Sequence, residues 1–431
     1  MRVTFYGGAE EVGRSCVIIE KGKRSIMLDC GIKLGEETQY PLISDSELQR
    51  IENIALSHAH LDHSGYLPHV YSKRAKPKIF LTKPTRDLMA VLLSDYCRLH
   101  TESTRRKLFT QKDVDNILKD ANIVDYNEEV KGTFDMTFHP AGHIIGSAMI
   151  KIKENNGILY TGDICVRKTK ILEGCERELK AETLIMESTY GGKDDVIPSY
   201  KDSANKLVAS INKTLDSGGH VIIPSFAVGR AQEILLILDD YMRSGALQKT
   251  KIYIEGMIGK ALRIYRHNAI YASEELKRRI LMSEDDPFKA SSFHYSRSKK
   301  REDVLAEPCI ILSTSGMLSG GPVLFYLQAL GQDPKNKMIF VGYQAPGTPG
   351  RKLIDGERKL KIRDVELDLK LQIESVKISG HADFNELLQF VKGIKGLKRV
   401  FIMHGEKTDL KDALEKSYEV VIPRLLESYG L

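Results

Sequence analysis

Short β-branched runs alternate with longer amphipathic segments along this chain. In the first half of the chain the strand-like runs are short, and the first of them are typical of a β-hairpin. They cover residues 1–6, 15–20, 25–29, 53–57, 78–82, 158–163 and 183–188. This alternation predicts an α/β protein whose sheets are covered by helices.

The pattern changes near residue 200, where helical periodicity becomes dominant. Helices are predicted over 201–218, 231–245 and 259–273. Buried strands separate them, at 220–225, 251–256, 309–314 and 338–343. A βαβ rhythm of this kind predicts a mainly parallel sheet.

The last part of the chain returns to the style of the first. A strand-like run at 376–381 precedes a helix that opens at Asp383, with Glu386 at capping-box spacing. A strand at 399–405 and a C-terminal helix follow. The order of patterns predicts one domain interrupted by another.

Length and composition fit a two-domain globular protein. The chain has 431 residues, of which 42% are hydrophobic and 28% charged. Its longest apolar runs fall far short of the ~20 residues that cross a bilayer. The N-terminus has no apolar export signal, so we expect a cytoplasmic protein without a membrane span.

The cysteines and the net charge indicate little about the function. The six cysteines form no CxxC pair, so we expect most of them to be buried free thiols and neither a zinc knuckle nor a disulfide framework. The formal charge of +6 is a weak excess, compatible with a polyanionic partner. A basic run at 296–303 fits either a nucleic-acid backbone or a solvated helix face.

The segment HAHLDH places His58, His60, Asp62 and His63 within six positions, directly after a strand-like run. His58 and His60 are two residues apart and point the same way on an extended segment. Imidazole and carboxylate ligands together suit divalent cations, zinc above all. A solvated polar turn is the simpler interpretation, but it leaves the crowding of imidazoles unexplained.

Four ligands cannot complete two metal shells, so further ligands are expected at other strand ends. Three later residues fit this expectation. They are His143 in PAGH, Asp163 in YTGD and His404 in MHGE.

These motifs resemble the metal-binding motifs of the metallo-β-lactamase fold. The segment between Glu187 and His381 resembles the β-CASP insertion of nucleic-acid-processing members. Its stretches IPSFAVGRAQE, STSGMLSGGP and GYQAPGTPGR resemble loops of RNase J and of proteins similar to the cleavage and polyadenylation specificity factor nuclease subunit. The resemblance implies an αββα sandwich over 1–191 and 380–431, with a β-CASP domain over 192–379.

The resemblance also implies a centre of two zinc ions. One ion would take His58, His60 and His143, and the other Asp62, His63 and His404, with Asp163 bridging them. Such ions lie about 3.5–4 Å apart and share a hydroxide that attacks phosphorus.

The resemblance further implies that four residues take part in catalysis. Asp62 would do so as a metal ligand, and Asp29 as an acid that orients ligands and water. His381 would act as general acid for the leaving 3′-oxygen, oriented by Glu187. Alternatives stay open, because Asp29 also suits a turn before Gly31 and His381 also suits a phosphate contact.

Loops of the inserted domain are expected to hold substrate. Backbone N–H groups at a helix start, an arginine fork and glycine-rich loops favour a phosphate. The predicted contacts are Ser225, Arg230, Ser313, Ser315 and Gln344. Glycines that only make turns explain each loop on its own equally well.

We therefore expect a zinc-dependent ribonuclease acting on single-stranded RNA in a cleft between the two domains, as an endonuclease, a 5′-to-3′ exonuclease or both. The rival interpretations are a small-molecule metallo-hydrolase, a catalytically silent RNA-binding subunit and a DNA-directed nuclease. The motifs do not extend to N-terminal KH-type modules or a separate C-terminal domain. The apolar segment 418–431 suits either homodimer formation or cover for its own sheet.

Overall fold

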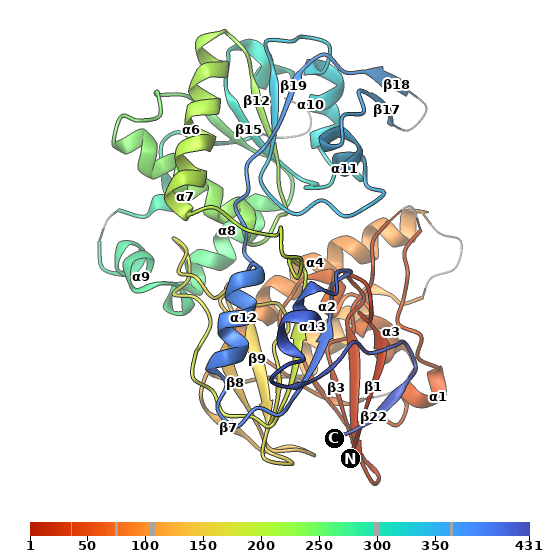
Figure 1. The fold of residues 1–431 in the computed structure, drawn as a ribbon. Coiled ribbons are helices and arrows are strands. Elements are labelled where there is room, and N and C mark those ends of the chain that lie inside the picture. The colour runs from red at the N-terminus through yellow and green to blue at the C-terminus, as the bar shows by residue number, and fades with distance from the viewer. Residues whose placement is uncertain (36, 74–75, 104–107, 284, 297–300, 363–364) are drawn as a thin grey trace. The chain divides into compact units, whose positions relative to one another are not determined.

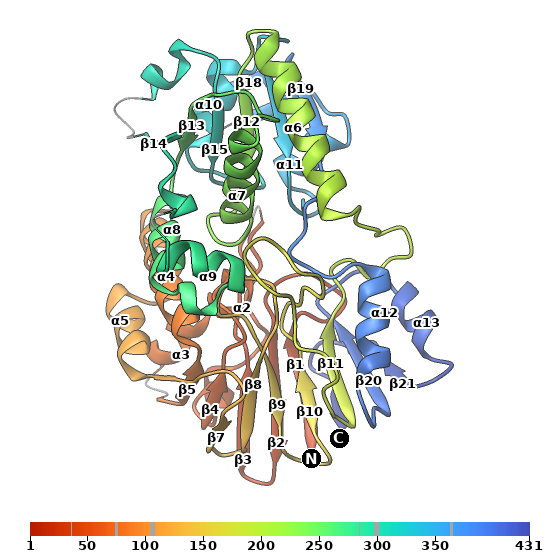
Figure 2. The same cartoon turned by 90° about the vertical axis from the view of Figure 1, so that its left-hand side faces the viewer.

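The computed structural model describes residues 1–431 apart from 36, 74–75, 104–107, 284, 297–300 and 363–364. The chain forms two compact units (Figures 1 and 2). The first unit consists of Met1–Lys168, Leu172–Val196 and Gly380–Leu431. The second consists of Thr169–Ile171 and Ile197–Ser379.

The first unit contains two seven-stranded sheets. One has the order β22 (Ser428–Gly430), β1 (Arg2–Gly7), β2 (Cys16–Lys21), β3 (Arg24–Leu28), β4 (Asn53–Ala55), β5 (Lys78–Leu81), β6 (Ala121–Ile123). The other has the order β21 (Glu419–Val421), β20 (Arg399–Met403), β11 (Thr183–Glu187), β10 (Ile158–Tyr160), β9 (Ala148–Ile152), β8 (Met136–Pro140), β7 (Glu129–Val130). Both sheets mix parallel and antiparallel pairs.

The two sheets share one hydrophobic core. Phe5 and Ile19 from one sheet pack in the same cluster as Phe138, Ile150 and Phe401 from the other. The inner-facing side chains alternate along each strand, as face-to-face packing requires. The predicted sandwich is therefore confirmed.

Helices cover the outer faces of this unit. They are α1 (Asp45–Leu48), α2 (Leu61–Ser64), α3 (Leu67–Ser72), α4 (Lys83–Ser103), α5 (Gln111–Asp120), α12 (Phe384–Gly393) and α13 (Asp409–Leu414). The helix α12 begins at the predicted cap, where Asp383 and Glu386 form a complete capping box. Its buried face packs on the second sheet through Leu387 and Val391.

The second unit is built on a six-stranded sheet in which every pairing is parallel, as the βαβ rhythm predicts. Its order is β14 (Phe293–Tyr295), β13 (Ile252–Ile254), β15 (Ile310–Ser313), β12 (Val221–Pro224), β16 (Lys337–Phe340), β19 (Gln372–Ser375). A separate antiparallel pair is formed by β17 (Lys359–Ile362) and β18 (Val365–Asp368).

Helices flank this parallel sheet (Figure 1). They are α6 (Tyr200–Asp216), α7 (Arg230–Arg243), α8 (Ile258–His267), α9 (Glu274–Leu281), α10 (Val323–Leu330) and α11 (Pro349–Ile354). Short 3₁₀ turns occupy η1 (Ala269–Tyr271), η2 (Pro287–Lys289) and η4 (Glu302–Ala306).

Two predicted elements are wrong in detail. The helix expected over 259–273 ends at His267, and Ser273 instead caps α9 by accepting a bond from the backbone N–H of Leu276. The strand-like run 376–381 forms no strand. Val376 and Ile378 are buried, so their alternation reflects an extended segment, whereas the strand β19 lies just before it.

The C-terminal segment forms strands within its own chain. Residues of β21 pair with β20, and β22 pairs with β1, so the segment extends both sheets of the first unit. Of the two alternatives for this segment, the structure shows cover for its own sheets. A homodimer stays a prediction.

Three further predictions concern the cysteines, membrane spans and the basic run. All six cysteines are buried free thiols, where the sequence predicted this for most of them. None of the described helices is long and apolar enough to cross a membrane. Four residues of the basic run 296–303, at 297–300, lie outside the described residues.

Candidate metal centre and its surroundings

The HAHLDH segment leaves β4 and turns into the short helix α2, whose N-cap is His60. The loop after β3 holds this turn from the side. Cys30 N–H donates to the carbonyl of His63 at 2.7 Å, and Ile32 N–H donates to that of Leu61 at 2.9 Å. A Cβ on Gly31 would overlap the carbonyl of Asp62, so only glycine allows this approach.

Seven side chains converge at this turn in two groups. The first group is His58, His60, His143 and Asp163, and the second is Asp62, His63 and His404. Within each group, one possible ligand atom per residue lies within 4.8 Å of all the others. The structure therefore brings together all seven residues that the sequence singled out as metal ligands.

Asp163 connects the two groups through its separate oxygens. Oδ2 lies 3.5 Å from His58 Nε2 and 3.6 Å from His143 Nε2. Oδ1 lies 3.2 Å from His63 Nε2 and 3.5 Å from His404 Nδ1. One carboxylate thus presents an oxygen to each group, which is the arrangement of a bridging ligand.

Buried polar atoms of this cluster fit a divalent metal. Among the described residues, Asp163 Oδ1, His63 Nε2 and His404 Nε2 are buried and make no hydrogen bond of regular geometry, although the first two lie 3.2 Å apart. Unsatisfied buried groups are costly, and a metal ion satisfies them. The mixed imidazole and carboxylate donors favour ions of the zinc type.

Ionisation of the ligands agrees with this interpretation. Burial lowers the pKa of His58 and of His143 well below the usual value, which keeps both imidazoles neutral. Burial alone would raise the pKa of Asp163, but the nearby His63 and His404 lower it well below its usual range. Neutral His58 and His143 and an ionised Asp163 are forms that bind metals. Burial alone would lower the pKa of His63, but the carboxylates of Asp163, Asp62 and Asp29 raise it well above its usual value, so a metal ion at this ring would displace a proton.

The backbone of one ligand supports a functional role for the cluster. His404 follows β20 with φ of 51°, a left-handed conformation that is unusual for a side chain other than glycine. Such strained residues concentrate at functional sites. Its backbone N–H donates to the carbonyl of Gly8 at 2.7 Å, which holds the strand end in place.

Asp29 lies behind the ligands and is completely buried. Its Oδ2 is 2.6 Å from His63 Nδ1 and accepts bonds from Ser57 Oγ at 2.6 Å and Tyr160 Oη at 2.7 Å. Its Oδ1 accepts from Ser57 N–H at 2.7 Å. A carboxylate bonded to the far nitrogen of a ligating histidine fixes the ring orientation and its tautomer.

His381 lies beside the first group of ligands. Its Nδ1 is 3.0 Å and 3.1 Å from the two carboxylate oxygens of Glu187, and its ring centroid is 4.4 Å from that of His143. Glu187 is itself fixed, because Oε1 accepts from Ile164 N–H at 2.7 Å. The predicted histidine and carboxylate are therefore in contact, next to the metal ligands.

The cluster is more open on one side than on the other. The side chains of His58, Asp163 and His404 are almost fully buried, whereas that of Asp62 is 33% exposed and that of His381 is 18% exposed. His60 is also partly exposed. Solvent therefore reaches the cluster at Asp62, His60 and His381.

Comparisons with known proteins agree with this geometry. Residues 18–189 match the metallo-beta-lactamase superfamily domain, 231–353 the Beta-Casp domain and 366–423 the Zn-dependent metallo-hydrolase RNA specificity domain. The transcription termination factor FttA of Methanothermobacter thermautotrophicus is 36% identical over 97% of this chain and 70% of its own length. This chain belongs to the β-CASP branch of the metallo-β-lactamase superfamily.

Two further relatives extend the comparison. An RNase J-like protein of Methanocaldococcus jannaschii is 36% identical over 94% of this chain and 92% of its own length. A crystal structure of an Enterococcus faecalis protein of unknown function superposes with a TM-score of 0.61 at 16% identity, covering 100% of this chain and 99% of that one. The second similarity shows the fold alone.

The predicted substrate residues of this β-CASP protein all lie in the second unit, at the carboxyl ends of β12, β15 and β16. Three of them already donate hydrogen bonds within the chain. Ser313 is fully buried and donates to the carbonyl of Thr314 at 3.3 Å, and Ser315 donates to that of Gly320 at 3.1 Å. Gln344 Nε2 donates to the carbonyl of Gly316 at 3.0 Å.

Ser225 and Arg230 flank the start of α7. Ser225 is buried and its hydroxyl donates to the carbonyl of Phe226 at 3.3 Å. Arg230 is partly exposed, and among the described residues none pairs with its guanidinium. Arg230 is therefore better placed than the three serines to meet an anion from outside.

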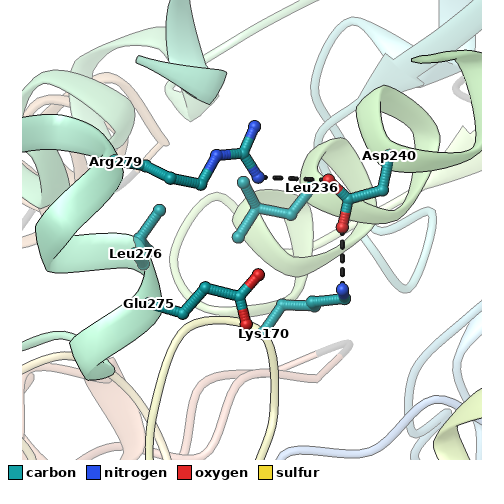
Figure 3. Close-up of a pocket in the computed structure, with 6 residues that line it drawn as sticks. All are labelled: Lys170, Leu236, Asp240, Glu275, Leu276 and Arg279. Carbon is teal, nitrogen blue, oxygen red and sulfur yellow. Dashed lines mark hydrogen bonds and ion pairs between the residues drawn. The ribbon is translucent and has the colours of Figure 1, made fainter. Parts of the chain in front are cut away.

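A small pocket elsewhere in the β-CASP unit is occupied by its own ion pairs (Figure 3). Lys170 Nζ lies 2.8 Å from Asp240 Oδ2, and Arg279 Nη1 lies 3.1 Å from Asp240 Oδ1. Glu275, Leu236 and Leu276 complete the lining. Lys170 and Arg279 therefore both pair with Asp240 within the pocket.

The residues that donate hydrogen bonds to Asp29 were not predicted from the sequence. Ser57 was placed in the strand 53–57 and Tyr160 in the strand 158–163, both only as part of those strands. Strand alternation could have indicated that Tyr160 faces inward. Nothing in the sequence indicates that its hydroxyl meets Asp29.

Proposed function

We propose that this chain is a zinc-dependent ribonuclease that hydrolyses phosphodiester bonds of single-stranded RNA in the cytoplasm, during RNA processing or decay. The observation that carries the proposal is the complete set of seven ligand side chains, with Asp163 spanning both groups, beside the His381–Glu187 pair. The RNA specificity domain and the RNase J-like relative support RNA as substrate.

The seven ligands would hold two zinc ions. Bound there, the ions would supply an activated water as nucleophile and neutralise charge that builds on the phosphate oxygens. Asp163 would be a ligand of both ions. Asp29 would fix the orientation of the His63 ring through the 2.6 Å contact between Oδ2 and Nδ1.

Within this reaction, His381 would deliver a proton to the leaving 3′-oxygen. Glu187 faces Nδ1 and holds the ring, so we assign Nε2 to the substrate. One possible ligand atom each of Asp163, Glu187 and His381 lie within 4.8 Å of one another, which brings the acid next to the proposed bridging carboxylate. A histidine held by a carboxylate suits general-acid catalysis near neutral pH.

The alternative is an RNA-binding subunit or termination factor that does not cleave RNA. The name of the FttA relatives favours a role in transcription termination. A silent subunit is expected to have lost ligands, whereas this chain retains all seven. For that reason we favour the nuclease.

The test is cleavage of one single-stranded RNA labelled separately at each end, with a 5′-monophosphate or a 5′-triphosphate, beside the matched DNA. We expect zinc-loaded protein to cut the RNA and not the DNA. Internal fragments that are independent of the 5′ group identify an endonuclease, and mononucleotides from monophosphorylated ends identify a 5′-to-3′ exonuclease. Intact RNA, or a preference for DNA, contradicts the proposal.

A further inference from the structure

Exposed phenylalanine and tyrosine rings are rare among the described residues. Only Phe226, at 38%, and Tyr295, at 57%, have large exposure there. Tyr295 is the last residue of β14, and Phe226 comes two residues after the end of β12. Both therefore lie at the carboxyl edge of the parallel sheet, where α/β proteins bind ligands.

The ring of Phe226 rests on glycines from the two neighbouring strands. A Cβ built on Gly316, after β15, would lie 3.4 Å from Phe226 Cδ2. A Cβ built on Gly342, after β16, would lie 3.7 Å from Phe226 Cε2. Because neither neighbour has a side chain, none rises beside the ring to cover it.

The loop that carries Phe226 is held in place by hydrogen bonds on both sides of the ring. Ser225 N–H donates to the carbonyl of Ser313 at 2.9 Å. Gln232 Nε2 donates to the carbonyl of Ala227 at 2.9 Å, and Gln232 Oε1 accepts from Gly229 N–H at 2.7 Å. A ring on a fixed loop loses little conformational freedom when a ligand binds.

A cationic side chain at the same edge is available to a ligand. Gln344 is not, because its Oε1 is buried against Gly350 and its Nε2 donates to the carbonyl of Gly316. Among the described residues no carboxylate pairs with the guanidinium of Arg230, four residues after Phe226. An aromatic face with a cation nearby is the combination that binds a nucleotide of a single strand.

The strand order explains why Phe226 and Arg230 lie together at the carboxyl edge of the parallel sheet. The chain leaves β12 toward β13 on one side and leaves β15 toward β16 on the other, although β12 and β15 are neighbours. Right-handed crossovers in opposite directions send the two connections to opposite faces of the sheet. The loops after β12 and β15 diverge there, which is the topological switch point of such a sheet.

A single exposed phenylalanine is ordinary on a protein surface. Other exposed apolar side chains of this unit, such as Met282 after α9, lie outside the carboxyl edge of the sheet. Phe226 differs in its glycine support, its fixed loop and its cationic neighbour.

We propose that Phe226 is a stacking site for one nucleobase of the bound RNA strand. The inference rests on the proposed function and names the contact that the β-CASP unit makes with a base rather than with the backbone. Stacking is tolerant of base identity, so the site would position the strand without reading its sequence.

The test combines abasic scanning of the RNA with substitution of the ring. Binding of a short phosphorothioate RNA, whose linkages resist cleavage, is measured by fluorescence anisotropy with zinc-loaded protein. One abasic position should weaken binding by roughly 5- to 150-fold in the wild type, the equivalent of about 1–3 kcal/mol per stacked base. In Phe226→Leu that position should no longer matter, and Phe226→Trp should restore its effect.

Met282→Ala is the matched control, because it shortens an exposed apolar side chain of the same unit, and it should bind like the wild type. The inference is overturned if Phe226→Leu binds the intact strand like the wild type, or keeps the same abasic penalty. Binding needs no hydrolysis, so a protein that stacks a base yet cuts no RNA would disprove the proposed function alone. A protein that cuts RNA with no abasic effect would disprove the stacking site alone.

Discussion

At the scale of single residues, the contact between His381 and Glu187 connects metal binding to proton transfer. The two residues are far apart in sequence, and both belong to the first unit. The backbone carbonyl of Gly380 is 2.8 Å from His143 Nδ1, so the loop that carries His381 also orients a metal ligand. The acid is thereby held at a fixed place relative to that ligand.

The variant His381→Ala should keep its zinc and lose cleavage rate. The imidazole is not one of the seven ligands, and general-acid help is worth about 10²–10⁴-fold in rate. Hydrolysis of RNA should fall by that factor. Hydrolysis of a phosphodiester with a p-nitrophenolate leaving group should fall much less, because that group needs no proton.

Zinc content and both rates are measured on the same preparation, and His267→Ala, an exposed histidine at the end of α8, serves as the control. An equal loss on both substrates would rule out the general-acid role. A loss of zinc would make His381 a ligand instead.

The ligands themselves were predictable from sequence, because imidazoles crowded together at strand ends are typical of a metal site. The supporting contacts were not. Asp29 accepts bonds from Ser57 and Tyr160, and the hydroxyl of Tyr160 comes from the opposite sheet of the sandwich. Such a contact depends on how two sheets pack, which local spacing does not specify.

At the scale of elements, the strand β12 begins beside a buried histidine. His220 is 9% exposed, and its Nδ1 lies 3.4 Å from Cys309 Sγ just before β15. Burial lowers the pKa of His220 below its usual value of 6.5. The folded chain therefore keeps this imidazole neutral at a pH where the unfolded chain takes up a proton.

This histidine should make the protein less stable in mild acid. Above about pH 6.5 neither state is protonated at this position, and below it the unfolded state gains a proton that the folded state resists. The free energy of unfolding should fall with decreasing pH there, by at most about 1.4 kcal/mol per pH unit for this group. In His220→Phe, urea unfolding at pH 7.5 and pH 5.5 should show a smaller difference than in the wild type.

The partly exposed His294 of β14 supplies the control, and His294→Phe should retain the wild-type difference. If His220→Phe also retains it, the buried imidazole does not contribute to the acid sensitivity.

Elements with apolar runs were predictable, and edge elements were not. The central strands β12, β15 and β16 are wholly buried and were predicted near their true positions. The strand β19 has the sequence QIES, lies at the edge of the sheet and pairs only with β16. A partly solvated edge strand needs no apolar run, so periodicity gives no signal for it.

At the scale of the whole molecule, the candidate metal ligands and the proposed base-stacking residue belong to different units. The first unit builds its metal ligands on strand ends of a sandwich whose two sheets share a core. The second unit carries a parallel sheet whose carboxyl edge presents Phe226 and Arg230. The inserted domain could be predicted from the sequence, because the hydrophobic periodicity changes near residue 200. The exposure of Phe226 could not, because it depends on how the loops after β12, β15 and β16 pack together.

The central claim is that the seven-residue cluster holds the metals that hydrolyse RNA. The most direct test measures zinc per chain by elemental analysis, and RNA cleavage, on the same preparations of wild type and Asp163→Ala. Asp135→Ala is the control, because it removes a carboxylate of the same unit that pairs with Lys131 at the surface. Circular dichroism checks that all three proteins fold.

The account predicts two zinc ions and RNA cleavage for the wild type and for Asp135→Ala, and the loss of both in Asp163→Ala, since that carboxylate serves both groups of ligands. An Asp163→Ala protein that keeps two zinc ions and cuts RNA at the normal rate would contradict it.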